Sequence, residues 1–221
     1  PANYGLNPTV FTADIEFAGQ VVKLNVTDPV ITAGVSIKKT GYAQTMNNNV
    51  MRWTVSGVRN DSTTSLQSFY WRDTLPTDAV RLTRLVTGTY STTQTYKVTF
   101  TTNLNSQWRT AYDNLSTAKN YTLDMSSAAL GLASNEYVTQ FMLSFGIVPA
   151  GFHQLTNATV DAQTLYALTN GYKFTNKADV GGLLGGNWVQ SIARWTTSVY
   201  SHYVPAKPAA PKSPKLPRTG Y

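Results

Sequence analysis

Short runs in which apolar and polar residues alternate extend along most of the sequence, separated by Asn, Gly, Asp, Ser and Pro. Thr, Val, Tyr, Phe and Ile dominate these runs, and such residues favour strands because β-branched and aromatic side chains fit a pleated surface. The pattern predicts strands at residues 10–16, 21–26, 35–39, 50–58, 68–73, 79–87, 94–101, 137–145, 171–176 and 195–200. A series of this kind, with short turns between its members, predicts an all-β sandwich.

Two segments break the pattern. In 105–119 and 158–170, Leu, Ala and Gln replace many of the β-branched residues. This composition predicts a short helix or a long loop in each segment.

The composition changes abruptly at Pro205. Residues 205–217 contain five Pro and a single large apolar side chain, which predicts a solvated stalk of polyproline II character. We therefore divide the chain into an N-terminal β segment at 1–32, a sandwich domain at 33–203 and a Pro- and Lys-rich stalk at 204–221. The first segment is interpreted as a separate hairpin, an edge of the main domain or the remnant of a preceding domain.

Composition and charge exclude several classes of site. The chain has no Cys and two His, which leaves no disulfide and no Cys-type zinc site, so we expect neither a metal nor a cofactor. The formal net charge is +7, but four of the basic residues lie in the tail, at Lys207, Lys212, Lys215 and Arg218. This distribution disfavours nucleic-acid binding. No apolar run approaches the length of a membrane-spanning helix, roughly 18 residues.

Three predicted strands each carry one polar residue on an otherwise apolar face. With a side-chain period of two, Lys39 shares a face with Val35 and Ile37. By the same period, Asp73 shares a face with Phe69 and Trp71. Asn176 shares a face with Tyr172 and Phe174. The sequence thus predicts that a lysine, an aspartate and an asparagine point into the core, where each would be unfavourable by itself.

Together these residues are the ingredients of an intramolecular isopeptide bond. Burial lowers the pKa of the Lys39 amine, so that it becomes a neutral nucleophile, and raises the pKa of Asp73, so that a protonated carboxyl polarises the Asn176 amide. Ammonia leaves and an amide joins Lys39 to Asn176. Ordinary roles also remain open: Lys39 as a solvated strand lysine, Asp73 as a turn acid and Asn176 as a turn or cap residue. Lys38 is an alternative to Lys39 if a bulge shifts the register. Glu136 is an alternative to Asp73, and Asn187 is an alternative to Asn176.

The order and local context of the three residues resemble the adhesin-type isopeptide domains of Gram-positive surface proteins. The contexts that carry the resemblance are Ile37-Lys38-Lys39-Thr40-Gly41, Trp71-Arg72-Asp73-Thr74-Leu75-Pro76 and Phe174-Thr175-Asn176-Lys177-Ala178. The resemblance implies an immunoglobulin-like, adhesin-type β-sandwich in which Asp73 promotes a bond between Lys39 and Asn176.

The chain ends with Leu216, Pro217, Arg218, Thr219 and Gly220, followed by Tyr221. This run resembles the Leu-Pro-any-Thr-Gly sorting motif of Gram-positive surface proteins. The resemblance implies cleavage after Thr219 by a sortase and transfer to peptidoglycan or a pilin lysine. It also implies a secreted, cell-wall-anchored protein.

The leading hypothesis is a non-enzymatic adhesin or a basal or accessory pilin, with a host-surface protein or glycan as the expected class of ligand. The alternative is a carbohydrate-binding module or lectin that uses exposed aromatic residues. Trp188 and Trp195 are the candidates for such a sugar site.

Overall fold

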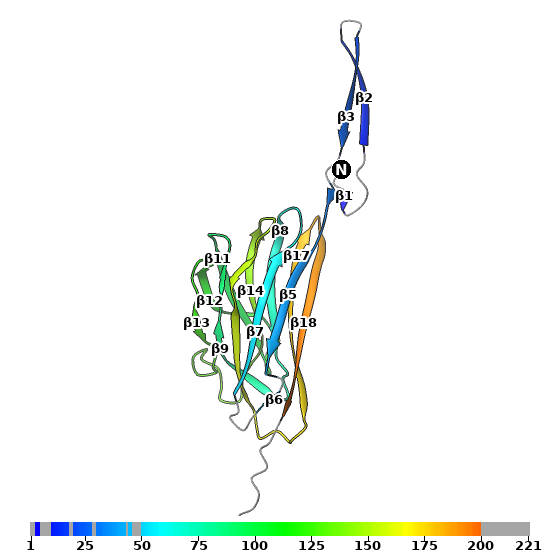
Figure 1. Cartoon of the computed structure of the whole chain (residues 1–221). Helices are drawn as coiled ribbons and strands as arrows, with labels where there is room; N and C mark the ends of the chain where they lie inside the picture. The colour runs from blue at the N-terminus through cyan, green and yellow to red at the C-terminus, as the bar shows by residue number, and fades with distance from the viewer. Residues whose placement is uncertain are drawn as a thin grey trace, which may run out of the picture.

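Two β-sheets packed face to face form the body of the protein in this computed structural model (Figure 1). Every regular element in the described part of the chain is a strand, so none of its segments is a helix suited to crossing a membrane. The structure describes the backbone of residues 3–4, 10–17, 20–27, 30–42, 44–45 and 50–199, and the side chains of residues 32–42 and 50–199.

The larger sheet has seven strands, and its neighbours are antiparallel except for the last pair, which is parallel. The long β17–β18 hairpin turns at Gly185 and Gly186, which both have positive φ and so favour glycine. In spatial order the strands are β12 (Arg109–Ser116), β11 (Thr95–Thr102), β14 (Val138–Val148), β8 (Leu66–Thr74), β17 (Lys173–Leu184), β18 (Asn187–Val199) and β6 (Gln44–Thr45).

The smaller sheet has five antiparallel strands. Its edge strand β5 lies against β17 and β18 of the larger sheet. This contact brings side chains from the two sheets together at one side of the sandwich. In spatial order the strands are β13 (Thr122–Asp124), β9 (Val80–Val86), β16 (Ala158–Thr164), β7 (Val50–Asn60) and β5 (Val35–Gly41).

Three strand pairs lie outside these sheets. β1 (Asn3–Tyr4) pairs with β4 (Val30–Ile31), and β10 (Thr89–Tyr90) pairs with β15 (Gln154–Thr156). The hairpin of β2 (Val10–Phe17) and β3 (Gln20–Thr27) is drawn beyond one end of the sandwich in Figure 1. The proposed division of the chain into domains stays a prediction, and the stalk lies outside the described residues.

The predicted all-β sandwich is confirmed, and all the predicted strands overlap strands of the structure. The expectation of a helix or loop at 105–119 and 158–170 is wrong, because β12 and β16 occupy much of these segments. Both strands are held by hydrogen bonds to their neighbours, β12 to β11 and β16 to both β7 and β9. Long-range pairing here overrides weak local propensity.

Large aromatic side chains fill the space between the sheets. Trp71 packs edge-on against Phe141, with ring centroids 5.5 Å apart, and its Nε1 donates a hydrogen bond of 2.8 Å to the Tyr90 hydroxyl. The Tyr90 hydroxyl in turn donates to the Thr87 carbonyl oxygen. The polar atoms of these core aromatics are therefore satisfied, as burial requires.

A candidate cross-linking site between the sheets

The three polar residues predicted to face the core come from three strands and from both sheets. Lys39 lies on β5 of the smaller sheet, whereas Asp73 and Asn176 lie on the adjacent strands β8 and β17 of the larger one. Asp73 is directly opposite Ala178, two residues along β17 from Asn176. This register makes Asp73 and Asn176 diagonal neighbours on the inner face of the sheet.

All three side chains are buried. Lys39 is 6% exposed, and Asp73 and Asn176 are not exposed at all. Lys39 Nζ reaches across from β5 and donates a hydrogen bond to Asp73 Oδ2, which forms a fully buried contact between an amine and a carboxyl group. The structure therefore brings Lys39 and Asp73 together.

The surroundings of this contact are apolar. Lys39 Nζ lies 5.8 Å from the centroid of the Trp53 ring, and Trp53 packs edge-on against Phe174 with ring centroids 6.4 Å apart. Phe174 shares the inner face of β17 with Asn176, because both are buried and two positions apart. Such a site has few groups that could stabilise a separated charge.

Burial dominates the protonation of the pair. It lowers the pKa of Lys39, and the nearby Asp73 only partly opposes this effect. Burial likewise raises the pKa of Asp73, against the opposing influence of Lys39 and of the Asn176 side chain. Both shifts favour a neutral amine beside a protonated carboxyl group, which is the protonation state that nucleophilic attack by a lysine requires.

Several polar atoms of the site are left without hydrogen-bond partners. Asp73 Oδ1 and both amide atoms of Asn176 are buried and unpaired. Asn176 is close enough to Asp73 to influence its pKa, although neither of its amide atoms completes a hydrogen bond of normal geometry. Each unpaired buried group costs about 1–3 kcal/mol, so this cluster destabilises the fold as it stands.

The alternative residues lie elsewhere. A register shift between Ser36 and Lys38 does occur in β5, but Ile37 and Lys39 are both buried and Lys38 is exposed. Glu136 binds Arg109 and Thr102, and Asn187 is exposed at the start of β18. The geometry therefore favours Lys39, Asp73 and Asn176 over these alternatives.

The predicted pairing of Trp188 with Trp195 in one sugar site is wrong. The two residues are an odd number of positions apart on β18 and so face opposite sides of the sheet. Trp195 Nε1 donates a hydrogen bond of 3.0 Å to the Tyr42 carbonyl oxygen, whereas Trp188 borders a groove on the outer face of the larger sheet. Trp108 and Tyr70, which the sequence analysis does not single out, also line this groove. The alternation that turns Phe69 and Trp71 inward turns Tyr70 outward.

No known family profile matches the sequence. No curated protein matches it either.

Solved structures with a similar arrangement of strands include a cohesin module from a Clostridium perfringens family 33 glycoside hydrolase, at 9% identity and a TM-score of 0.40, covering 77% of this chain and 100% of that one. The C-terminal domain of the AgI/II polypeptide BspA of Streptococcus agalactiae has 11% identity and a TM-score of 0.38. The match covers 82% of this chain and 55% of that one. The collagen-binding domain of a Staphylococcus aureus adhesin has 11% identity and a TM-score of 0.32. The match covers 71% of this chain and 95% of that one. These values indicate a distant structural similarity and are too low to bear on function.

Proposed function

We propose that this chain is a non-enzymatic, sortase-anchored surface protein of the adhesin or pilin type, whose immunoglobulin-like sandwich is closed by an isopeptide bond between Lys39 and Asn176. The observation that carries the proposal is the meeting of a buried lysine and a buried aspartate next to an asparagine whose amide is unpaired. The function of the protein is then mechanical, since the bond would hold the two sheets together under load.

The proposed reaction is a transamidation that needs no external reagent. Neutral Lys39 Nζ attacks Asn176 Cγ, and the protonated Asp73 carboxyl stabilises the developing oxyanion and then passes a proton to the leaving nitrogen. The new bond joins Nζ to Cγ, the bond from Cγ to Nδ2 breaks, and ammonia leaves. Asp73 recovers its proton from the attacking nitrogen, so it is a catalyst of this single event and is not consumed.

The reaction would also remove the unfavourable features of the site. It replaces an ionisable amine by a neutral amide and eliminates one unpaired amide nitrogen, while the protonated Asp73 can donate to the amide oxygen that remains. A neutral amide has no charged form to desolvate, so it suits an apolar environment better than an ionisable amine does. This consequence supports the assignment of Lys39, Asp73 and Asn176 as one chemical unit.

Intact-mass measurement tests the cross-link. We expect the mass of the chain to fall short of the sequence value by one ammonia, and we expect Lys39→Ala and Asn176→Ala each to show no such deficit. Lys38→Ala is the matched control, since this exposed neighbour should leave the deficit unchanged. A parent protein of full sequence mass would contradict the proposed bond.

The anchoring part of the proposal depends on residues 216–220, which lie outside the described residues. By its resemblance to sorting motifs, this run is expected to be cut between Thr219 and Gly220, with Thr219 joined to peptidoglycan or to a pilin lysine. Incubation with a sortase of matching specificity and a glycine peptide should yield a product ending in Thr219 joined to that peptide. Thr219→Ala should abolish the product without changing the melting temperature, and equal conversion of both proteins would refute the motif.

A further inference from the structure

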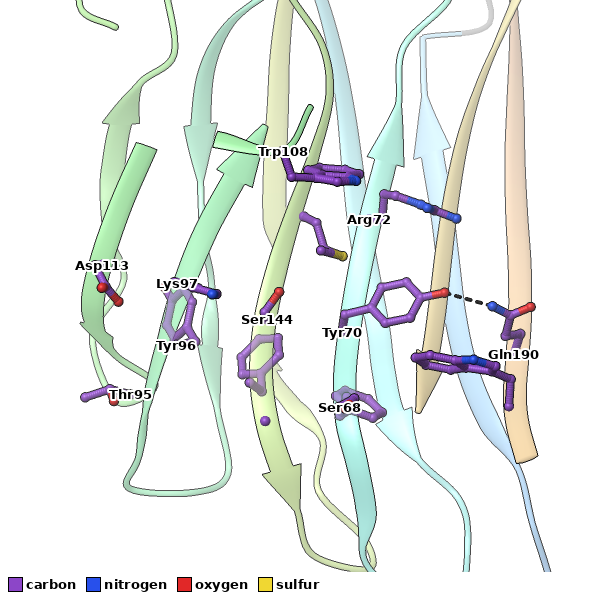
Figure 2. A pocket seen from close by; sticks show the side chains of 15 residues that line it. Ser68, Tyr70, Arg72, Thr95, Tyr96, Lys97, Trp108, Asp113, Ser144 and Gln190 are labelled. Atoms are coloured by element: carbon purple, nitrogen blue, oxygen red, sulfur yellow. Dashed lines mark hydrogen bonds between the residues drawn. The ribbon is translucent and has the colours of Figure 1, made fainter. Parts of the chain in front are cut away.

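A groove of about 710 Å³ crosses the outer face of the larger sheet, on the side opposite the cross-linking site. This volume falls within the range of roughly 300–1,000 Å³ that is typical of small-ligand sites. Figure 2 shows side chains from several strands around it, with Asp113, Lys97 and Tyr96 on one side, Ser144 near the middle, and Tyr70, Arg72 and Gln190 on the other.

Two tryptophans at the groove are open to solvent. Trp108, which precedes β12, is 40% exposed, and Trp188, at the start of β18, is 54% exposed. Figure 2 shows the Trp108 ring projecting over one end of the groove. Exposed indoles offer flat apolar surfaces, whereas the tryptophans Trp53 and Trp71 are fully buried in the core. Both indoles therefore leave part of their surface open to a ligand.

Hydrogen bonds fix one wall of the groove in place. The Tyr70 hydroxyl donates to Asp179 Oδ2 at 3.1 Å and accepts from Gln190 Nε2 at 3.0 Å, the contact drawn in Figure 2. Arg72 binds both oxygens of the buried Asp179 carboxylate, at 3.0 and 2.9 Å. Tyr70 also packs edge-on against Trp188, with ring centroids 5.9 Å apart. The wall is thus rigid before any ligand arrives, which lowers the entropy lost on binding.

Two residues with unusual backbone geometry lie at or next to the groove. Ser68 (φ 50°) and Asn114 (φ 54°) are the non-glycine residues with positive φ in the described part of the chain. Ser68 lines the groove, and Asn114 directly follows Asp113, which also lines it. The pairing of β14 with β8 shifts register around Gly146, another lining residue. Strained residues and bulges occur preferentially at binding sites.

We propose that this groove binds a short, uncharged oligosaccharide. The exposed faces of Trp108 and Trp188 would each pack against the apolar C–H face of a sugar ring. The sugar hydroxyl groups would form hydrogen bonds with polar side chains of the groove lining. Those side chains offer both donors and acceptors and are Ser68, Thr95, Lys97, Ser144 and Gln190.

The charge of the lining supports a neutral ligand. Arg72 is neutralised by Asp179, and the remaining charged residues of the lining, Lys97 and Asp113, have opposite signs. A polyanion would therefore find no cluster of positive charge. A Lys-rich peptide such as residues 204–217 would find no excess of acid. The mixture of flat apolar rings and scattered hydrogen-bonding groups suits a neutral sugar ring with its hydroxyl groups better than a polyanion or a basic peptide.

The experiment applies the labelled full chain to a glycan microarray and then titrates the strongest soluble hit by calorimetry. Trp108→Ala and Trp188→Ala should each weaken binding by roughly tenfold or more. Tyr166→Ala is the matched control, because Tyr166 is an exposed aromatic residue outside the groove and should bind like the parent. Circular dichroism confirms the fold of each variant. The mass deficit, measured on the same samples, reports the cross-link separately.

Three outcomes would overturn the proposal. One is the absence of saturable binding to any glycan on the array. A second is a hit whose affinity is unchanged in both tryptophan variants. The third is saturable binding of a synthetic peptide with the sequence of residues 204–217 that is lost in both variants, which would make the groove a site for proline-rich chains.

Discussion

Asp73 and Asp161 are both buried aspartates, but they lie in opposite electrostatic environments. Asp73 points between the sheets, where a single lysine from the other sheet contacts one of its oxygens and the second oxygen is unpaired. Asp161 points to the outer face of the smaller sheet, where Arg52 and Arg84 on the two neighbouring strands bind it. The pKa of Asp73 is raised by its burial. Burial also acts to raise the pKa of Asp161, but the arginine hydrogen bonds outweigh it and lower that pKa.

The difference shows how the strand register sets the electrostatic environment of a buried carboxyl group. Arg52 and Arg84 are directly opposite Asp161 in the strand register, and their guanidinium groups supply enough donors to satisfy both oxygens. Asp73 has Phe141 and Ala178 directly opposite it, so neither of its cross-strand partners carries a positive charge. Its protonated form is therefore favoured, and it can serve as an acid.

The largest expected effect comes from Asp73→Asn, which keeps the size of the side chain and removes the acid. We expect the variant to have the full sequence mass, because the transamidation no longer proceeds. The free energy of unfolding should fall by on the order of 5 kcal/mol, the loop-closure value for a cross-link that spans more than a hundred residues. Denaturant unfolding and intact mass measure the two effects. Retention of the ammonia deficit would contradict the role given to Asp73.

Gly181→Ala tests the outer wall that carries Tyr70. An added Cβ would lie 2.9 Å from the Tyr70 ring and hydroxyl, so Tyr70 must move away from Asp179 and Gln190. We expect a loss of about 1–3 kcal/mol of stability and an unchanged mass deficit. Gly34→Ala is the control, since its Cβ would make an ordinary contact of 3.5 Å. Equal melting temperatures for the two variants would argue against a tightly held Tyr70.

Asp161→Asn tests the other member of the comparison and should have a smaller effect. Arg52 and Arg84 are about half exposed, so water replaces part of what they lose. We expect a loss of about 1–2 kcal/mol in urea unfolding, with the ammonia deficit retained. A full-mass Asp161→Asn protein would mean that the cross-link depends on the overall stability of the sandwich and not on the chemistry of Asp73.

The smallest expected effect is the pH dependence of the stability lost in Asp161→Asn. Because the folded pKa of Asp161 is lowered, its contribution to stability is fully present above the ordinary aspartate pKa of about 3.9 and is lost as the pH falls through the folded value. The stability difference between the parent and Asp161→Asn should therefore be constant near neutral pH and shrink in acid. Urea titrations at a series of acidic pH values measure it, and a difference that grows in acid would have the wrong sign.

The strand pattern of the sequence could predict which polar residues face the core. Ile37 and Lys39 face the same side because strand side chains have a period of two, and the same local rule turns Asp73 and Asn176 inward. The register shift between Ser36 and Lys38 did not change this result, because Ile37 and Lys39 are both buried and Lys38 between them is exposed. A rule that depends only on neighbouring residues can be applied without knowing the fold.

The groove could not be found in this way. Trp108 lies just before β12, in a segment whose composition favours a helix or loop, and it reaches the groove because β12 pairs with β11. Trp188 lies outside the predicted strand 195–200, and the continuous strand β18 puts it and Trp195 on opposite faces. The groove is made by side chains from five strands, so no single segment carries its signature.

The sequence by itself determined the strand-rich composition and the inward direction of Lys39, Asp73 and Asn176, because these follow from local propensity and alternation. Only the tertiary structure decided that β5 lies against β17 and that β8 pairs with β17, which brings the lysine to the aspartate beside the asparagine. The physical reason is that strand pairing is set by contacts between residues far apart in the chain. Its free energy depends on how whole faces pack, and no short stretch of sequence contains that information.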